Sequence, residues 1–308
     1  MARKQQGNRK SSARQQPTDQ REERRGEQRG DRRGPISEQV DSGLAELVRD
    51  RDRADAWTLL LDGAPQSHVD LTDPGYLSFE YQRRFGHLVD LAAAPGKPIS
   101  ALHLGGGALT LARYVAAGRP RSRQQVAEID TRLTELVRRE LPLDKNWQLR
   151  VRGGDARDIL ARSPAAAADL VVADIYSGAR IPAHCTSIEF ATLAANALRP
   201  EGRYAVNITD GGQLGFARSQ VATLRAVFAE VALVGDPTVL RGRRFGNLVL
   251  VAAQQPLPLD ELTRRIATDP FPGRVESGPR LVDFQAGAAP VTDDGAGPSP
   301  APPPGAFS

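Results

Sequence analysis

Three carboxylates in this sequence stand where a short strand-like run ends, and their positions suit contact with a nucleoside or a cation. They are Glu128, Asp155 and Asp174. A carboxylate accepts hydrogen bonds from hydroxyl and amino groups, and one that ends a buried strand can take a proton as a general base. We expect Glu128 to receive both hydroxyls of a ribose, Asp155 to receive an adenine amino group, and Asp174 to act as a base. Two plainer interpretations stay open, a solvated strand end for Glu128 and a helix N-cap for Asp155.

Three consecutive glycines, Gly105, Gly106 and Gly107, follow another strand-like run. Glycines at this point let the backbone approach a ligand and turn sharply into the helix that follows. A nicotinamide dinucleotide fingerprint would need a further glycine where Thr110 stands. Glu128 lies roughly 20 residues beyond the glycines, the spacing at which an acidic residue reaches a ribose in such folds. The glycines and Glu128 together predict a site for an adenosine-containing ligand.

The elements that must hold these residues alternate between strand-like and helix-like periods. Six runs are typical of strands: residues 99–104, 125–129, 148–151, 170–174, 204–208 and 247–252. Five helical stretches lie between or after them: residues 109–117, 131–140, 156–162, 187–198 and 216–230. We therefore expect an α/β fold, a Rossmann-like, doubly wound, mostly parallel sheet with a small N-terminal β element. In such a sheet ligands bind outside the carboxyl ends of the strands, where the glycines and the carboxylates fall.

Composition divides the chain into five segments. Residues 1–40 form a basic tail, and residues 284–308 form a tail rich in Pro, Ala and Gly. Both tails have few large apolar residues, so we expect them to be disordered. Between them we expect a helix and a β-hairpin over residues 41–98, the Rossmann-like domain over 99–254 and a C-terminal extension over 255–283.

The net charge of +4 comes from the N-terminal tail. Residues 1–34 hold eleven basic and five acidic residues, which leaves a net charge of −2 on the rest of the chain. The body of the protein is therefore not a basic nucleic-acid-binding surface. We expect at most a weak contact between the tail and nucleic acid.

The Cys, His and hydropathy patterns exclude other classes of protein. The single cysteine, Cys185, cannot form an intrachain disulfide, and the four histidines are scattered, so we expect no metal site. No apolar run is long enough to cross a bilayer, and the first residues contain no apolar signal-peptide core. We expect a cytoplasmic protein with no membrane partner.

Several short motifs resemble those of the spermidine synthase (polyamine aminopropyltransferase) family and, more broadly, of class I S-adenosylmethionine-dependent methyltransferases. They read HLGGGALTL, VAEID, GGDAR, VVADIYSG and LRPEGRYAVNI. Upstream, LDGAPQS at residues 61–67 resembles the family's LDGxxQS β-hairpin, and YQRRFGH at residues 81–87 resembles its YHExxxH segment. The upstream hairpin separates this family from ordinary methyltransferases. The resemblance covers about two thirds of the chain.

The resemblance implies a donor and a role for each site residue. The donor would be decarboxylated S-adenosylmethionine or S-adenosylmethionine, with no metal. Tyr81 and Tyr176 would lie near the acceptor amine, and Asp174 would accept its proton, because a protonated amine cannot attack the carbon next to a sulfonium. The residues that would line the nucleoside and its amino-acid-derived arm are Gln66, Gly105, Gly106, Gly107, Glu128, Asp155 and Ala156.

A few positions depart from the family pattern. Ala108 stands where the family has the Asp that meets the donor's amine, and Ser177 stands where it has a second Asp for the acceptor. Gln82 and Arg83 replace a His and a Glu. Whether Arg83 and Arg180 face the site, where they would repel a polyamine, stays open.

The expected activity is transfer of an aminopropyl group from decarboxylated S-adenosylmethionine to a small-molecule amine. Two alternatives remain, an S-adenosylmethionine-dependent methyltransferase and a non-catalytic nucleoside-binding protein that retains the fold. A homodimer also stays open.

Overall fold

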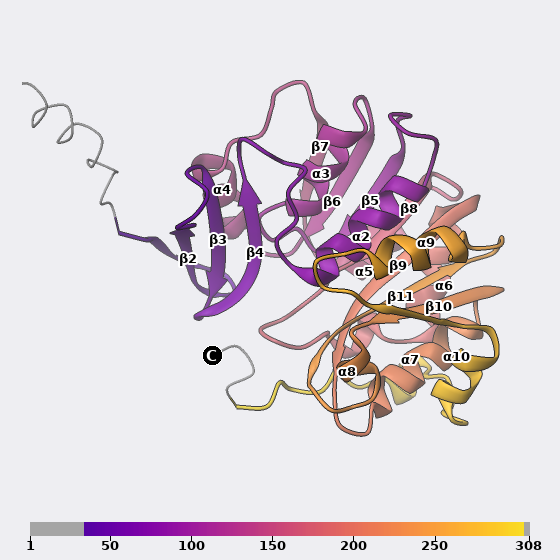
Figure 1. The fold of residues 1–308 in the computed structure, drawn as a ribbon. Coiled ribbons are helices and arrows are strands. Elements are labelled where there is room, and N and C mark those ends of the chain that lie inside the picture. The colour runs from indigo at the N-terminus through magenta and orange to yellow at the C-terminus, as the bar shows by residue number, and fades with distance from the viewer. Residues whose placement is uncertain (1–33, 305–308) are drawn as a thin grey trace, which may run out of the picture. The chain divides into compact units, whose positions relative to one another are not determined.

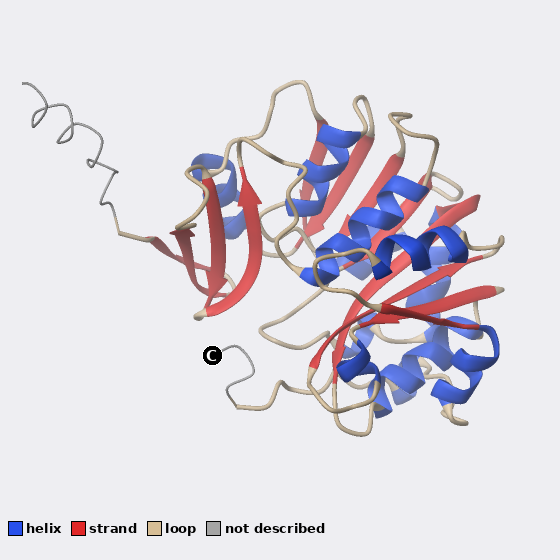
Figure 2. Cartoon of the chain, viewed as in Figure 1, coloured by secondary structure: helices blue, strands red, loops and turns tan. Residues whose placement is uncertain are grey.

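The computed structural model describes residues 34–304, in two β-sheets and their covering helices (Figure 1, Figure 2). The strands are β1 (Ile36–Val40), β2 (Gly43–Arg49), β3 (Ala56–Leu61), β4 (Ala64–Asp70), β5 (Ser100–Leu104), β6 (Arg123–Glu128), β7 (Gln148–Gly153), β8 (Ala168–Ala173), β9 (Leu198–Asp210), β10 (Glu230–Gly235), β11 (Gly246–Ala253) and β12 (Arg274–Ser277). The helices are α2 (Glu80–Leu91), α3 (Thr110–Gly118), α4 (Thr131–Glu140), α5 (Ala156–Ala161), α6 (Ile188–Ala197), α7 (Gly215–Arg225), α8 (Pro237–Leu240), α9 (Leu259–Ala267) and α10 (Gly278–Gln285), with short 3₁₀ turns at Ala183–Cys185 and Asp293–Gly295.

The larger sheet has eight strands in the order β12-β10-β11-β9-β8-β5-β6-β7. The five neighbouring strands β9, β8, β5, β6 and β7 are all parallel to one another. Strand β11 pairs antiparallel with both β9 and β10. From β5 the chain winds outward through β6 and β7, and then returns to β8 and winds the other way. The strand order therefore reverses between β5 and β8, the place where doubly wound sheets bind their ligands. The predicted mostly parallel α/β sheet is confirmed.

Helices cover both faces of this sheet, because its strands are apolar on both sides. One face packs against α5, α6, α7 and α10 through residues such as Phe190, Leu224 and Leu281. The other face packs against α2, α3 and α9, which lie over the sheet in Figure 1. The strands thus lie between two layers of helices, and residues at their carboxyl ends line the cavity described below.

The smaller sheet holds β1 to β4 in sequence order, with every neighbouring pair antiparallel. Its apolar face, which includes Leu47 and Leu59, packs against α3 and α4. The pairing of β3 with β4 shifts register by one residue at Gln66, opposite Leu59 and Leu60. A bulge of this kind re-aims a side chain. It places Gln66 in the wall of the cavity described below.

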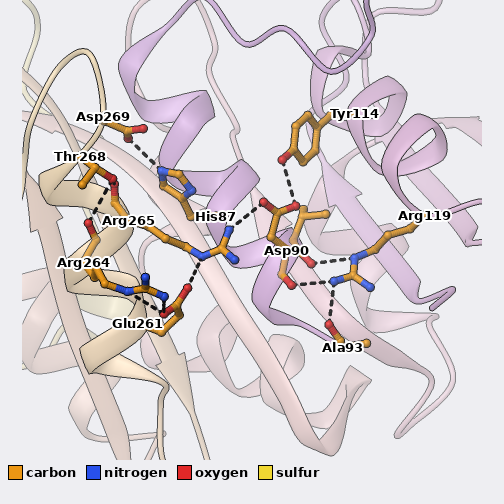
Figure 3. Close-up of polar contacts among 11 residues, drawn as sticks. His87, Asp90, Ala93, Tyr114, Arg119, Glu261, Arg264, Arg265, Thr268 and Asp269 are labelled. Atoms are coloured by element: carbon orange, nitrogen blue, oxygen red, sulfur yellow. Dashed lines mark hydrogen bonds and ion pairs between the residues drawn. The ribbon is translucent and has the colours of Figure 1, made fainter. Parts of the chain in front are cut away.

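Helix α2 is tied to its neighbours by a partly buried polar network (Figure 3). The buried Arg119 guanidinium donates to the carbonyl oxygens of Val89, Asp90 and Ala93 at and just after the end of the helix, where carbonyl groups run short of helical partners. The Asp90 carboxylate accepts from the Tyr114 hydroxyl at 2.9 Å and from Arg265 of α9 at 3.0 Å. The network holds α2 in place, and α2 contributes Tyr81 and Gln82 to the cavity described below.

The chain's segments differ from those expected at both ends. Residues 1–33 of the expected basic tail lie outside the described residues, but residues 36–40 form β1, so the expectation of disorder is wrong there. Residues 41–98 hold three strands and α2 rather than a helix and one hairpin. The expectation is also wrong over residues 284–304, which contain the end of α10, a 3₁₀ turn and the fully buried Ser299.

Two strands of the larger sheet were not expected from the sequence. The helix expected over residues 216–230 ends at Arg225, and Glu230 already begins β10. Strand β12, in the expected C-terminal extension, pairs with β10 and so belongs to the same sheet. No helix among residues 34–304 is both long and apolar enough to cross a membrane.

Candidate active site

The glycine loop and the end of β8 meet at the switch point of the larger sheet. Gly105 has a φ of 94°, a backbone conformation that favours glycine. A Cβ atom built on Gly105 would lie 2.1 Å from the carbonyl oxygen of Asp174. The loop therefore needs glycine to let β5 and β8 end side by side.

A cavity of about 400 Å³ opens at this point. The ten residues that the sequence singled out come from six different elements and loops, yet all of them line it: Gln66, Tyr81, Gly105, Gly106, Gly107, Glu128, Asp155, Ala156, Asp174 and Tyr176. The fold thus brings the predicted residues together, while their individual roles stay predictions.

Glu128, at the end of β6, holds the glycine loop. Its Oε2 accepts the N–H groups of Gly106 at 2.8 Å and Gly107 at 3.1 Å, and its Oε1 accepts the N–H of Asp130 at 2.9 Å. A carboxylate has about four acceptor positions. One position on Oε1 therefore remains for a ribose hydroxyl, where the sequence suggested two.

Asp155, at the start of α5, has two roles at once. Its Oδ1 caps the helix by accepting the N–H groups of Arg157 and Asp158, as the plainer interpretation expected. Its Oδ2 lies 2.8 Å from Nε2 of His184. Burial opposes the ionisation of Asp155, but His184 and the helix amides outweigh it, so the pKa of this carboxyl is lowered. Asp155 thus presents an ionised oxygen to the cavity, next to the half-exposed imidazole of His184.

Asp174, directly after β8, is held by two side-chain amides. Asn207 of β9 donates to its Oδ1 at 3.0 Å, and Gln82 of α2 donates to its Oδ2 at 3.2 Å. Burial raises the pKa of Asp174 to about 6, although hydrogen bonds from Asn207 and Tyr81 oppose the rise. A carboxylate with a pKa near neutrality can accept and release a proton at physiological pH.

Two tyrosines stand beside Asp174. Tyr81 packs edge to face on Phe85, which fixes its ring in the wall of the cavity. Burial and the nearby charge of Asp174 raise the pKa of both Tyr81 and Tyr176. Both hydroxyls therefore stay protonated and can donate to a base or to a ligand.

The described lining of the cavity is acidic. Its carboxylates are Glu128, Asp155 and Asp174, and neither lysine nor arginine is among the residues that line it. Arg83 lies instead near the ring of Tyr76, and the Nε of Arg180 donates to the carbonyl oxygen of Ser299. Neither arginine that the sequence left open lines the cavity.

Ala108 does not line the cavity either. It is fully buried against the apolar face of the smaller sheet, and its N–H donates to the Ser67 hydroxyl at 3.2 Å. A carboxylate placed here would enter an apolar contact rather than the cavity. The expectation that residue 108 faces the donor's amine therefore finds no support in the structure.

Among the lining residues that were not assigned from the sequence, four are of chemical interest. Asn207 and Thr209 lie two residues apart near the end of β9, so the alternation of a strand places both on one side. Ile129 exposes 63% of its side chain beside the cavity, which suits contact with a flat nucleobase. His184 also lines the cavity, and no local pattern in the sequence indicates its contact with Asp155.

The C-terminal segment, residues 288–304, fastens the loop that carries Tyr176. Ser299 and Ile181 exchange two hydrogen bonds, at 3.1 Å and 2.9 Å, while Ser299 also accepts from Arg180 at 2.6 Å. Asp293 pairs with Arg157 of α5 through two bonds of 2.7 and 2.6 Å. These contacts hold the wall of the cavity between Asp174 and α6.

The known proteins that are similar to this chain include spermidine synthases and a methyltransferase. The crystal structure of a probable spermidine synthase from Corynebacterium glutamicum ATCC 13032 has a TM-score of 0.78 and 30% sequence identity, over 83% of this chain and 95% of that one. A polyamine aminopropyltransferase from Vibrio vulnificus is 27% identical over 191 residues, which are 59% of this chain and 61% of that protein's length. Human methyltransferase-like protein 13, solved in complex with SAH, has a TM-score of 0.51 at 22% identity, over 61% of this chain and 89% of that one.

These similarities support different conclusions, because they differ in sequence identity and in the share of the chain that is covered. At 22% identity the human protein shows the shared methyltransferase-like fold alone. The Corynebacterium structure, at 30% identity over 83% of this chain and 95% of its own, shows the family to which this chain belongs. No family model matches the sequence. Among residues 34–304 there is no cluster of three or more side chains of the kind that binds a metal ion.

Proposed function

The chain belongs to the spermidine synthase family, and on that basis we propose that it transfers an aminopropyl group from decarboxylated S-adenosylmethionine to a small-molecule amine. The observation that carries the proposal is Asp174. Glu128 and Asp155 accept backbone N–H groups, whereas the bonds that the structure shows to Asp174 come from the side-chain amides of Gln82 and Asn207. Of the three carboxylates in the described lining, Asp174 is therefore the one that remains available to take a proton. It lies at the switch point, where donor and acceptor would meet.

The proposed reaction forms one bond and breaks one. The acceptor enters as an ammonium ion and passes a proton to Asp174. Its nitrogen lone pair then attacks the aminopropyl carbon next to the sulfonium. The new N–C bond forms while the C–S bond breaks, and methylthioadenosine leaves with that electron pair. Asp174 later returns its proton to solvent, which its pKa of about 6 permits near neutral pH.

The pH dependence of the rate follows from Asp174. The carboxylate must be ionised to accept the proton, and burial raises its pKa to about 6. We expect kcat/KM for the amine to fall about tenfold per pH unit below that value and to level off above it. The measurement is a rate profile from about pH 5 to 8, with the melting temperature recorded at each pH as a control. A rate that stays constant across this range would remove Asp174 from the proton transfer.

Glu128 and Asp155 are proposed to bind the nucleoside, with Ile129 against the base. We expect Glu128→Ala to weaken methylthioadenosine binding by about 10- to 100-fold, because a charge-assisted hydrogen bond is lost and two loop amides lose their acceptor. Glu128→Gln, which keeps an acceptor oxygen without the charge, should lose less. Titration calorimetry measures both, and an unchanged dissociation constant for Glu128→Ala would exclude the ribose assignment.

The donor is proposed to be the decarboxylated form because the described lining of the cavity offers a carboxylate neither a lysine or arginine nor a free N–H of the glycine loop. The N–H groups of Gly106 and Gly107, which could receive one, already donate to Glu128. That of Ala108 donates to Ser67, and the lining contains no lysine or arginine among the described residues. We expect decarboxylated S-adenosylmethionine to bind at least about tenfold more tightly than S-adenosylmethionine. Calorimetry with the two donors checks this, and equal affinities would favour a methyltransferase instead.

A further inference from the structure

The part of the cavity around Asp174 is neutral apart from that carboxylate. The other side chains gathered there are Tyr81, Gln82, Tyr176, Asn207 and Thr209. Of the three carboxylates that line the cavity, Glu128 is bonded to the glycine loop, and Asp155 caps α5 and contacts His184. One negative charge is therefore left for an acceptor.

A positive charge lies behind this end of the cavity. Arg84, one turn beyond Tyr81 on α2, has 2% of its side chain exposed and donates to the carbonyl oxygen of Asn247 at 3.2 Å. Asn247 itself lines the cavity. The carboxylate nearest to Arg84 is Glu80, at 3.6 Å, outside the lining. Arg84 is ion-paired with Glu80 and neither residue lines the cavity, so this end of the described lining offers an ammonium no second carboxylate.

From these charges, and resting on the proposed transfer to an amine, we infer that the acceptor carries a single positive charge and an otherwise uncharged chain, rather than being a diamine. The second ammonium of a diamine would lose part of its hydration among neutral side chains without gaining a counter-ion, which costs free energy.

The unpartnered polar atoms near Asp174 support the same acceptor. Gln82 Oε1, Asn207 Oδ1, Tyr176 OH and Thr209 Oγ1 are buried and have no hydrogen-bond partner. An ammonium has three N–H donors. It can give one to Asp174 and the others to the two amide oxygens, which satisfies groups that are otherwise left unpaired. The site thus suits one ammonium group, and the neutral hydroxyls of Tyr176 and Thr209 are available to the rest of the acceptor.

The experiment compares two acceptors of equal length, 4-aminobutan-1-ol and 1,4-diaminobutane, which differ in a terminal hydroxyl against a terminal ammonium. Each is titrated into the full chain saturated with methylthioadenosine, so the result does not depend on turnover. We expect the amino alcohol to bind at least about tenfold more tightly. Equal affinities, or tighter binding of the diamine, would overturn the inference.

Variants of Ser177, which lines the cavity three residues after Asp174, supply the second arm. Ser177→Asp adds a carboxylate and should shift the affinity ratio toward the diamine by about tenfold, whereas the neutral Ser177→Asn should leave it unchanged. An unshifted ratio in Ser177→Asp would contradict the charge argument. Transfer is then assayed separately with both amines. If neither amine is modified while the binding order holds, the proposed function fails and the inference about charge stands.

Discussion

Asp174→Asn is expected to lower aminopropyl transfer by about 10²- to 10⁴-fold while the protein stays folded and still binds methylthioadenosine. The variant removes the proton acceptor but keeps the shape of the side chain. Its new NH₂ group would face a donor, either Gln82 or Asn207. Both amides have an unpartnered oxygen, so a half-turn of one amide supplies the missing acceptor. We therefore expect the substitution to alter only the hydrogen bonds around residue 174.

The same variant is expected to be more stable than the parent at neutral pH. A carboxyl whose pKa rises from 3.8 to about 6 on folding binds its proton more tightly in the folded chain. Its ionisation thus costs stability as the pH rises from about 4 to 6, and the full cost persists above pH 6. Removing the charge should raise the free energy of unfolding at neutral pH by about 1 to 2 kcal/mol. This is roughly half of the free energy that the whole pKa shift corresponds to, because water in the cavity screens the charge.

Both effects are measured on the same preparations. Steady-state release of methylthioadenosine gives the rate, and denaturant unfolding at neutral and acidic pH gives the stability. Asp260→Asn, the same substitution on the exposed first turn of α9, is the control; it should leave the rate unchanged and should not raise the free energy of unfolding, because a carboxylate in the first turn of a helix is slightly stabilising. A variant that keeps more than about a tenth of the parent rate would rule out Asp174 as the general base.

Gly105→Ala is expected to abolish nucleoside binding and to destabilise the larger sheet. The added Cβ would lie 2.1 Å from the carbonyl oxygen of Asp174, which is backbone and cannot swing away, and φ at this position is 94°. The loop and the end of β8 must separate. We expect binding of methylthioadenosine to weaken more than about 100-fold and the free energy of unfolding to fall by about 2 to 4 kcal/mol.

Calorimetry and denaturant unfolding measure these two effects. Gly118→Ala, at the end of α3, is the matched control because a Cβ added there would meet nothing within 4 Å and the residue has no positive φ. It should leave binding unchanged. If Gly105→Ala binds methylthioadenosine as the parent does, the glycine loop does not form the nucleoside site.

The sequence predicted those parts of the protein that local patterns determine. The runs that became β5, β6, β7 and β8 each end at a glycine loop or a carboxylate, so both the sheet and the gathering of Glu128, Asp155 and Asp174 at one edge could be foreseen. The confirmed family resemblance depends on the same motifs.

What the sequence could not supply depends on contacts between distant segments. The amides that hold Asp174 come from α2 and β9, which are 92 and 33 residues away along the chain. Residue 108 follows the glycines, but it packs against the smaller sheet and bonds to Ser67, 41 residues away. The C-terminal segment looked unable to pack because it has few apolar residues, yet Ser299 and Asp293 anchor it through polar contacts with the loop after β8 and with α5. Composition does not reveal contacts of that kind.

The proposed function is tested most directly by incubating the purified full chain with decarboxylated S-adenosylmethionine and, in separate reactions, 4-aminobutan-1-ol or 1,4-diaminobutane, and following both products by chromatography and mass spectrometry. We expect methylthioadenosine and aminopropylated amine in equal amounts with at least one of the two amines, and we expect Asp174→Asn to form both at least about 100-fold more slowly. Absence of methylthioadenosine with both amines, or formation of S-adenosylhomocysteine from S-adenosylmethionine with the amine methylated instead, would contradict the proposed function.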